Sequence, residues 1–256
     1  MKLHSLAGGL AALLLVGAAH ATAAAPSSDI AAAVADPTRP DADKALDSER
    51  KPAEILSFIR LKPGQTIVDV FPGDYWDRLF ADVVGPRGHV VAFYPAEIAK
   101  FKKGGLPLTG SHPFPDHPNI EAVTAPIDAF AVPKRADVIW IRQNYHDLYD
   151  HFMGPADVPG FDKAVFKALR PGGYFVVIDH VAPAGSDLAS TNTTHRIDPE
   201  RVKRDMAAAG FKFVASSAAL KNPEDDHTKA VFDKSLRGHT DQFVFLFQKP
   251  YPMPLD

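Results

Sequence analysis

Short hydrophobic runs alternate with amphipathic segments along most of the chain. The runs are rich in β-branched and aromatic residues, and several are almost continuously apolar, which is typical of parallel strands buried on both faces. These runs lie at residues 65–71, 89–95, 119–127, 136–144 and 174–181. The segments between them have a helical period and are closed by glycine or proline, at residues 77–85, 96–105, 161–173 and 199–210. The alternation predicts a Rossmann-like α/β fold, with a doubly wound, mostly parallel sheet in a three-layer αβα arrangement.

Two further hydrophobic runs, at 211–219 and 241–249, follow each other without a helix between them. We therefore expect the last strand to pair antiparallel with its neighbours. The intervening segment 221–240, KNPEDDHTKAVFDKSLRGHT, is longer than a hairpin loop needs. Insertions of this length commonly cover a pocket or form an interface, and a solvated polar loop is the alternative.

The first 25 residues have the three-part layout of a secretory signal peptide, with Lys2, an apolar run from Leu6 to Ala19, and small residues before Pro26. The apolar run is too short to span a bilayer comfortably, although a retained membrane anchor is the alternative. We expect cleavage near residues 21–25 and no stable anchor in the mature protein. The chain would then be exported, to the periplasm in a Gram-negative bacterium and otherwise to the medium.

Residues 26–45 are rich in Ala, Pro and Asp, and we interpret them as a linker or a loosely docked arm before one domain over 46–256. The next segment, DSERKPAEILSFIRL at 47–61, has apolar residues at helical spacing. It predicts one amphipathic helix that ends before the Lys-Pro-Gly sequence at 62–64.

Composition excludes several functional classes. The 256 residues include 28 Lys and Arg against 31 Asp and Glu, without a basic block, so a nucleic-acid partner is not expected and a small-molecule ligand is. The chain contains no cysteine, which excludes disulfides, thiolate catalysis and cysteine metal sites. It also lacks the GxSxG, SxxK, HExxH and phosphate-loop motifs, so no hydrolase or nucleotidase class is indicated.

Two local motifs and the order of the elements resemble the class I S-adenosylmethionine-dependent methyltransferase superfamily. LRPGGYFVVID at 169–179 resembles that family's fifth strand with the turn before it, and VGPRGHVVAF at 84–93 resembles the link from its first helix to its second strand. The resemblance covers about residues 50–250. The chain as a whole is also similar to the predicted methyltransferases that carry export signals. It implies transfer of a methyl group from S-adenosylmethionine to a small molecule.

The turn VDVFPGDYWDRL at 68–79 differs from the family's acid-x-Gly-x-Gly-x-Gly pattern. Asp69 matches the acid, but Phe71 and Tyr75 replace the outer glycines and only Gly73 remains. Glycines at these positions let the backbone approach a cofactor closely, so aromatic side chains there predict a pocket walled by Phe71, Tyr75 and Tyr94. The cofactor-binding residues that the resemblance implies are Asp69, Phe71, Pro72, Gly73, Asp74, Tyr75, Tyr94, Asp128 and Asn144.

Chemically versatile side chains follow the predicted strands, where ligands bind in doubly wound sheets. The sequence NYHDLYDH at 144–151 holds two His, two Asp and two Tyr, which are the residue types of general-base and hydrogen-bonding sites. Further candidates come after the strand at 174–181. The predicted catalytic residues are Tyr145, His146, Asp147, His180 and His195, and the predicted substrate contacts are Arg196, His227 and Arg237.

Two other functions are compatible with the same residues. The protein could be a ligand-binding protein on the same fold that has lost its cofactor site. It could also be a metal-dependent exported enzyme that uses His146, Asp147, His180 and His195, since His and carboxylate groups bind zinc without cysteine. A purely structural role for the polar segments, such as Asp198 capping the helix at 199–210, is the remaining alternative.

Overall fold

The computed structural model describes residues 25–154 and 156–252. The predicted signal peptide, residues 1–25, therefore falls outside the described residues except for Ala25. In the part of the chain that is described, no helix has the length and apolar character that crossing a membrane requires.

A seven-stranded sheet with the order β3-β2-β1-β4-β5-β7-β6 forms the centre of the protein. β7 runs antiparallel to β5 and β6, and the other neighbouring pairs are parallel, which confirms the predicted fold class. The strands are β1 (Thr66–Val70), β2 (His89–Pro95), β3 (Ile120–Ala125), β4 (Ala136–Arg142), β5 (Leu169–His180), β6 (Lys212–Ser217) and β7 (Gln242–Gln248).

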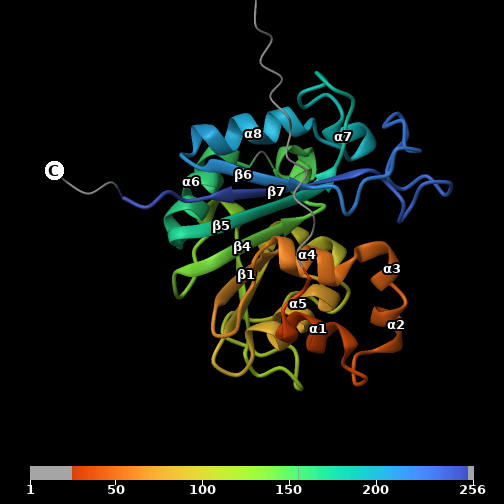
Figure 1. Ribbon diagram of the computed structural model, residues 1–256. Coiled ribbons are helices and arrows are strands. Elements are labelled where there is room, and N and C mark those ends of the chain that lie inside the picture. Colours follow the sequence, from red (N-terminus) through yellow and green to blue (C-terminus); the bar gives the residue numbers. More distant parts are fainter. Residues whose placement is uncertain (1–24, 155, 253–256) are drawn as a thin grey trace, which may run out of the picture.

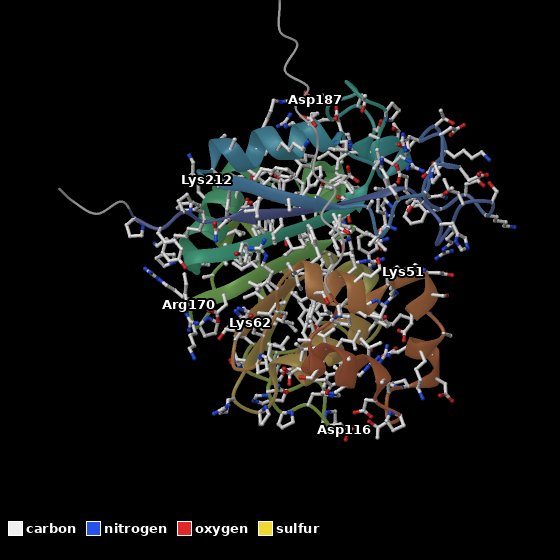
Figure 2. The ribbon with its side chains drawn as sticks, viewed as in Figure 1. Lys51, Lys62, Asp116, Arg170, Asp187 and Lys212 are labelled. Atoms are coloured by element: carbon white, nitrogen blue, oxygen red, sulfur yellow. The ribbon has the colours of Figure 1, made fainter. Side chains whose placement is uncertain are left out.

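Helices cover both faces of the sheet, with α8 on one side and α1, α4 and α5 on the other (Figure 1). Successive strand residues point to opposite faces, so Ile67 packs in the α4–α5 layer and Val68 in the α6–α8 layer. Charged side chains such as Lys62, Asp116 and Lys212 lie at the surface (Figure 2). The α-helices are α1 (Ser28–Ala35), α2 (Asp41–Lys44), α3 (Asp47–Arg50), α4 (Pro52–Phe58), α5 (Asp74–Val84), α6 (Val158–Ala168), α7 (Thr191–Thr194) and α8 (Pro199–Ala208).

The segment predicted as one helix over 47–61 forms two helices, α3 and α4. Lys51 between them has φ 49°, in the left-handed region. A residue before proline is disfavoured in the right-handed helical region, so Pro52 ends α3 at Arg50 and begins a new helix. The prediction of a single helix was therefore wrong.

Residues 26–45 carry α1 and α2 and pack against the rest of the protein. Ile30 of α1 is buried in the layer formed by α4 and α5. Two ion pairs add to this contact, from Arg39 to Asp47 at 2.7 Å and from Arg78 to Asp43 at 2.8 Å. This arm consequently lies against α5, the helix that follows the first strand.

Two other predicted boundaries differ from the structure. α6 ends at Ala168, and Pro171, Gly172 and Gly173, predicted to close that helix, lie inside β5. Gly172 adopts φ 79° and donates its N–H to the Lys249 carbonyl, so the strand ladder continues through an irregular stretch. The segment after β2 forms a six-residue 3₁₀-helix, η1 (Ala96–Phe101), in place of the predicted α-helix over 96–105.

Candidate active site

The segments that follow β4 and β5 meet at the carboxyl edge of the sheet, because these strands are parallel neighbours. β4 ends at Arg142, and the chain then turns through Gln143, with φ 59°, into the 3₁₀-helix η3 (His146–Tyr149). β5 ends with Asp179 and His180. This arrangement brings His146 next to Asp179 although 33 residues separate them.

Asp179 fixes the orientation of His146. Its Oδ1 lies 2.8 Å from His146 Nδ1, and its Oδ2 accepts the backbone N–H of His146 at 2.8 Å. Oδ1 also accepts the backbone N–H of His180. Since Asp179 is fully buried and holds Nδ1, the other ring nitrogen of His146, Nε2, faces the pocket.

Two side chains lie close to the Nε2 atom of His146. Asp147 Oδ1 lies 3.1 Å from it and His195 Nδ1 lies 3.3 Å from it. His195 Nδ1 is also 3.5 Å from Asp150 Oδ2 and 3.6 Å from Asp147 Oδ1. One nitrogen or oxygen atom from each of His146, Asp147, Asp150 and His195 therefore lies within 4.8 Å of the others. We call these four residues the His–Asp cluster.

The two histidines at this edge differ in charge, because carboxylates dominate the pKa of His146 and burial dominates that of His180. Burial opposes the charge on His146, but the pairs with Asp179 and Asp147 outweigh it and raise the pKa of His146 to about 10. Burial lowers the pKa of His180 to about 3, so this ring is neutral at pH 7. His146 is thus protonated at neutral pH in the metal-free protein, which argues against the predicted role of its imidazole as a general base.

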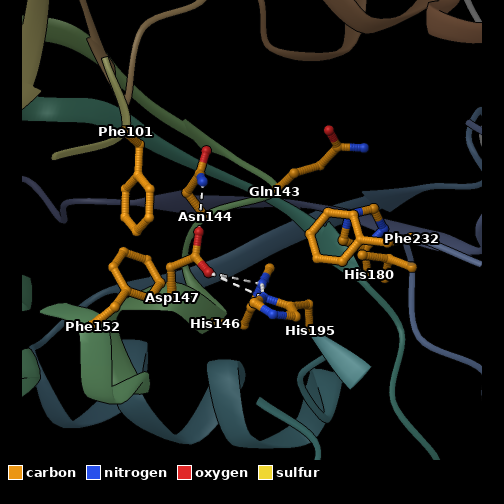
Figure 3. Close-up of a pocket in the computed structure, with 10 residues that line it drawn as sticks. Phe101, Gln143, Asn144, His146, Asp147, Phe152, His180, His195 and Phe232 are labelled. Atoms are coloured by element: carbon orange, nitrogen blue, oxygen red, sulfur yellow. Dashed lines mark hydrogen bonds and ion pairs between the residues drawn. The ribbon is translucent and has the colours of Figure 1, made fainter. Parts of the chain in front are cut away.

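A cavity of about 380 Å³ opens beside the cluster (Figure 3). Phe101 and Phe152 form one wall, with ring centres 5.5 Å apart, and Phe232 packs against His195 on the other side at 4.9 Å. The ten lining residues are Phe101, Gln143, Asn144, His146, Asp147, Phe152, His180, His195, Val231 and Phe232. Two of them belong to the insertion at 221–240, which therefore contributes to the pocket wall.

A second group of buried charges lies at the turn after β1. Asp69 accepts the backbone N–H of Gly73, and Asp77 of α5 lies next to it. Burial and the neighbouring carboxyl raise the pKa of Asp69 well above its usual value, and burial raises that of Asp77 to about 8. Both oxygens of Asp77 are buried, and among the described residues neither has a hydrogen-bond partner.

Arg142, at the end of β4, faces this acid pair. Burial and the nearby charge of Arg50 lower the pKa of Arg142 to about 10, while Asp69 opposes that effect. The Nε atom of Arg142 is buried and has no hydrogen-bond partner in the described part of the chain. A buried acid pair and an incompletely bonded guanidinium therefore lie together at the first turn.

No protein-family model and no curated protein matches this sequence. Solved structures do resemble it. A SAM-dependent methyltransferase from Aquifex aeolicus is 16% identical, with 82% of this chain and 97% of that chain covered and a TM-score of 0.51. The [4+2]-cyclase SpnF is 15% identical, with 82% of each chain covered and a TM-score of 0.53. A Haloferax volcanii complex of the Trm112 methyltransferase activator with a putative methyltransferase gives 14% identity, 84% and 95% coverage, and a TM-score of 0.52.

The chain has the class I methyltransferase fold. Its strand order and its antiparallel seventh strand, together with these structural neighbours, establish that architecture. Because one of the neighbours is a cyclase, the methyltransferase fold alone does not determine the reaction.

On this methyltransferase fold, several predicted site residues lie away from the pocket. Tyr145 is fully buried and donates its hydroxyl to Asp162 of α6 at 3.0 Å. His227 contacts Asp241 at 2.9 Å, and Arg237 is exposed in the insertion. None of the three predicted residues lines the cavity.

Arg196 was predicted to contact substrate, but its guanidinium is completely enclosed. It pairs with Asp225 at 2.9 Å and donates to the backbone carbonyls of Val181 and Lys229. Each of its three guanidinium nitrogens has a hydrogen-bond partner within the protein. Arg196 therefore fastens the insertion to the end of β5 and does not bind a ligand.

Phe71, Tyr75 and Tyr94, predicted to wall a pocket at the first turn, do not line this cavity. The Tyr75 hydroxyl donates to Asp47 at 2.7 Å, so its ring packs under the N-terminal arm. Tyr94 is buried near the acid pair, and Phe71, with φ 64°, is partly buried against the α6–α8 layer. Three phenylalanines from separate loops form the wall instead.

The remaining predicted cofactor-binding residues lie at the first turn, after β3 and after β4. Pro72 is buried and Gly73 and Asp74 are exposed in the turn, with Asp74 at 3.9 Å from Arg78. Asp128 accepts the backbone N–H of Asp157, the N-cap of α6. Asn144 lines the cavity and donates to Asp147 Oδ2 at 2.6 Å.

Sequence reasoning did not select Asp150, Asp77 or Arg142. Asp150 lies in the segment 144–151, and Asp77 lies in the turn at 68–79. Arg142 could have been selected because it is a charged residue at the end of an apolar strand.

Proposed function

We propose that this protein transfers a methyl group from S-adenosylmethionine to a small molecule bound in the cavity beside the His–Asp cluster. The observation that carries the proposal is the group of incompletely bonded buried charges at the turn after β1. Buried polar groups without partners are costly, so a ligand of complementary charge is the simplest explanation for them.

The residues at this turn fit the amino-acid end of the cofactor, which carries an ammonium and a carboxylate. The acid pair of Asp69 and Asp77 suits the ammonium, and Arg142 with Arg50 suits the carboxylate. Around Gly73 no atom lies within 4 Å of the position that a Cβ would take, so a ligand can approach the backbone there.

The ribose end of the cofactor has no comparable acidic partner. Glu97, the first acid after β2, accepts the backbone N–H of Ile127 with both oxygens, at 3.0 and 3.2 Å. The usual acid at the end of the second strand is therefore absent, and the binding energy must come mainly from the amino-acid end and the adenine.

The chain's own groups prepare the acceptor for transfer. S-adenosylmethionine, when bound, supplies an electrophilic methyl group. The walls formed by Phe101, Phe152 and Phe232 exclude water from the acceptor. Burial raises the pKa of Asp147, but its contacts with His146 and other neighbouring groups lower that pKa by more, so the net change is a decrease. The carboxylate of Asp147 is therefore ionised and accepts a hydrogen bond from a hydroxyl or amine of the methyl acceptor.

The proposal includes export of the protein, which the pattern of residues 1–25 supports. Methyl transfer outside the cytoplasm requires that the cofactor be delivered there. A small polar or aromatic molecule is the expected acceptor, because both aromatic rings and carboxylates line the cavity.

Titration calorimetry with S-adenosylmethionine tests this function. The wild-type protein is expected to bind one cofactor, and Asp69→Asn and Arg142→Met are each expected to weaken binding about 10- to 100-fold. Hydrogen bonds to charged groups contribute about 1.5–3 kcal/mol, and about 1.4 kcal/mol corresponds to a tenfold change. Asp116→Asn, which removes an exposed acid outside this turn, is the control and should bind normally. Absence of heat from the wild type at millimolar cofactor would disprove the proposal.

A further inference from the structure

The geometry points to a binding site for one divalent transition-metal ion of the Zn²⁺ type, held by His146 Nε2, Asp147 Oδ1, Asp150 Oδ2 and His195 Nδ1. The site lies at the carboxyl ends of β4 and β5, on the cavity wall. This inference does not depend on S-adenosylmethionine, because it concerns a different group of residues from those at the first turn.

Four of the six separations among the ligand atoms match a metal coordination sphere, and the other two are within 4.8 Å. A tetrahedral ion with bonds of about 2.0–2.1 Å separates its ligand atoms by roughly 3.3–3.4 Å. The separations here are 3.1 Å for His146 and Asp147, 3.3 Å for the two histidines, and 3.5 and 3.6 Å from His195 to the two acids. Side chains from two segments, separated by more than 40 residues, are thus already arranged around one point.

Hydrogen bonds within the cluster do not satisfy its atoms. The Nδ1 atom of His146 is engaged by Asp179, so Nε2 is the only ring atom that faces both Asp147 and His195. Asp150 is buried, and its Oδ1 has no hydrogen-bond partner in the described residues. In the metal-free protein the single proton on Nε2 of His146 does not bridge all four groups, whereas a metal ion that replaces it contacts all four ligand atoms at once.

Groups around the cluster hold the ligand atoms in place. Asp179 contacts Nδ1 of His146, the carboxylate–histidine arrangement that commonly supports metal-binding histidines. Asn144 occupies the second oxygen of Asp147 and so directs Oδ1 towards the cluster. His195 adopts φ 54° at the end of α7, a conformation that costs a non-glycine residue energy and that is concentrated at functional sites.

The ligand types select the ion. Two imidazoles with two carboxylates suit Zn²⁺ and its first-row neighbours, whereas Mg²⁺ and Ca²⁺ prefer oxygen ligands throughout. His146, Asp147 and His195 all line the cavity, so an ion bound here is open to a small molecule on that side. An oxygen or nitrogen atom of that molecule is then the expected additional ligand.

Metal titration of the purified chain, prepared without a histidine tag and stripped with a chelator, tests the site. One Zn²⁺ per chain is expected to bind, and to raise the melting temperature through its preference for the folded state. Mg²⁺ at the same concentration should have little effect. Co²⁺ should give the intense visible absorption of a tetrahedral site. A titration without a stoichiometric endpoint, or Co²⁺ without that absorption, would overturn the proposal.

Substitutions locate the bound ion among the eleven histidines of the chain. His195→Gln and Asp150→Asn should each weaken Zn²⁺ binding at least tenfold, and Asp179→Asn, which removes only a supporting contact, by about 10- to 100-fold. His151→Gln, an exposed neighbour in the same segment, is the matched control and should bind as the wild type does.

Circular dichroism of each apo variant establishes that it is folded. Equal Zn²⁺ affinity of folded His195→Gln and His151→Gln would show that the ion binds elsewhere. All titrations are done without S-adenosylmethionine, so a failure of the methyl-transfer proposal leaves their result unaffected.

Discussion

Replacing Arg196 with methionine is expected to lower the free energy of unfolding by about 3–5 kcal/mol. Neither Arg196 nor Asp225 has exposed side-chain surface, and their charged atoms lie 2.9 Å apart. Methionine fills much of the same volume but leaves the Asp225 carboxylate buried without its cationic partner. Urea unfolding at neutral pH, followed by circular dichroism, measures the change.

Two companion variants separate this ion pair from a general effect of removing an arginine. Arg204→Met removes a cation that pairs with Asp187 at the surface, where both side chains are more than half exposed, and should cost less than about 1 kcal/mol. Adding Asp225→Asn to Arg196→Met should recover part of the loss, because the uncompensated buried charge is then gone. A loss below about 1 kcal/mol for Arg196→Met would contradict the burial of this pair.

Replacing Asp77 with asparagine is expected to make the stability of the protein less sensitive to a rise in pH between about 4 and 8. The pKa of Asp77 is raised to about 8 in the folded protein, against a usual value of about 3.9 in the unfolded chain. A raised pKa gives stability that is fully present below the unfolded value and is lost as pH rises through the folded value. Between about pH 4 and 8 the folded state thus holds a proton that the unfolded state has released.

The expected size of this effect follows from proton linkage. Within that window the wild type should lose up to about 1.4 kcal/mol per pH unit relative to Asp77→Asn, since the two differ by about one proton. Urea unfolding of both proteins at several pH values between about 5.5 and 7.5 lies inside the window and measures the difference. Asp116→Asn, at an exposed position away from this turn, should parallel the wild type. Parallel curves for the wild type and Asp77→Asn would show that Asp77 ionises normally.

The sheet could be predicted from the sequence because a strand buried on both faces is a continuous run of apolar residues. Continuous apolar runs marked the five parallel strands, and the missing helix between the last two runs indicated antiparallel pairing, as observed. The break at Lys51 was readable in principle from Pro52, but the apolar spacing on both sides of the proline favoured one continuous helix.

The candidate site was only partly predictable because its partners are distant in sequence. The segment 144–151 was recognised by its position after a buried strand. The role of Arg196 depends on Asp225, 29 residues later, and no local pattern distinguishes an arginine that binds a ligand from one that binds the protein. The cavity wall likewise combines Phe101, Phe152 and Phe232 from three loops, which have no periodicity to reveal that they meet.

The anchoring of the insertion at 221–240 has an evolutionary consequence. Its base is fixed through Asp225 and Arg196, whereas Phe232, farther along, is 59% exposed and still lines the cavity. Substitutions at Phe232 can therefore reshape the cavity mouth without disturbing the ion pair, although they remove the ring that packs on His195. Sequence change is accordingly expected to be tolerated at Phe232 more readily than at Arg196 or Asp225, whose side chains are completely enclosed.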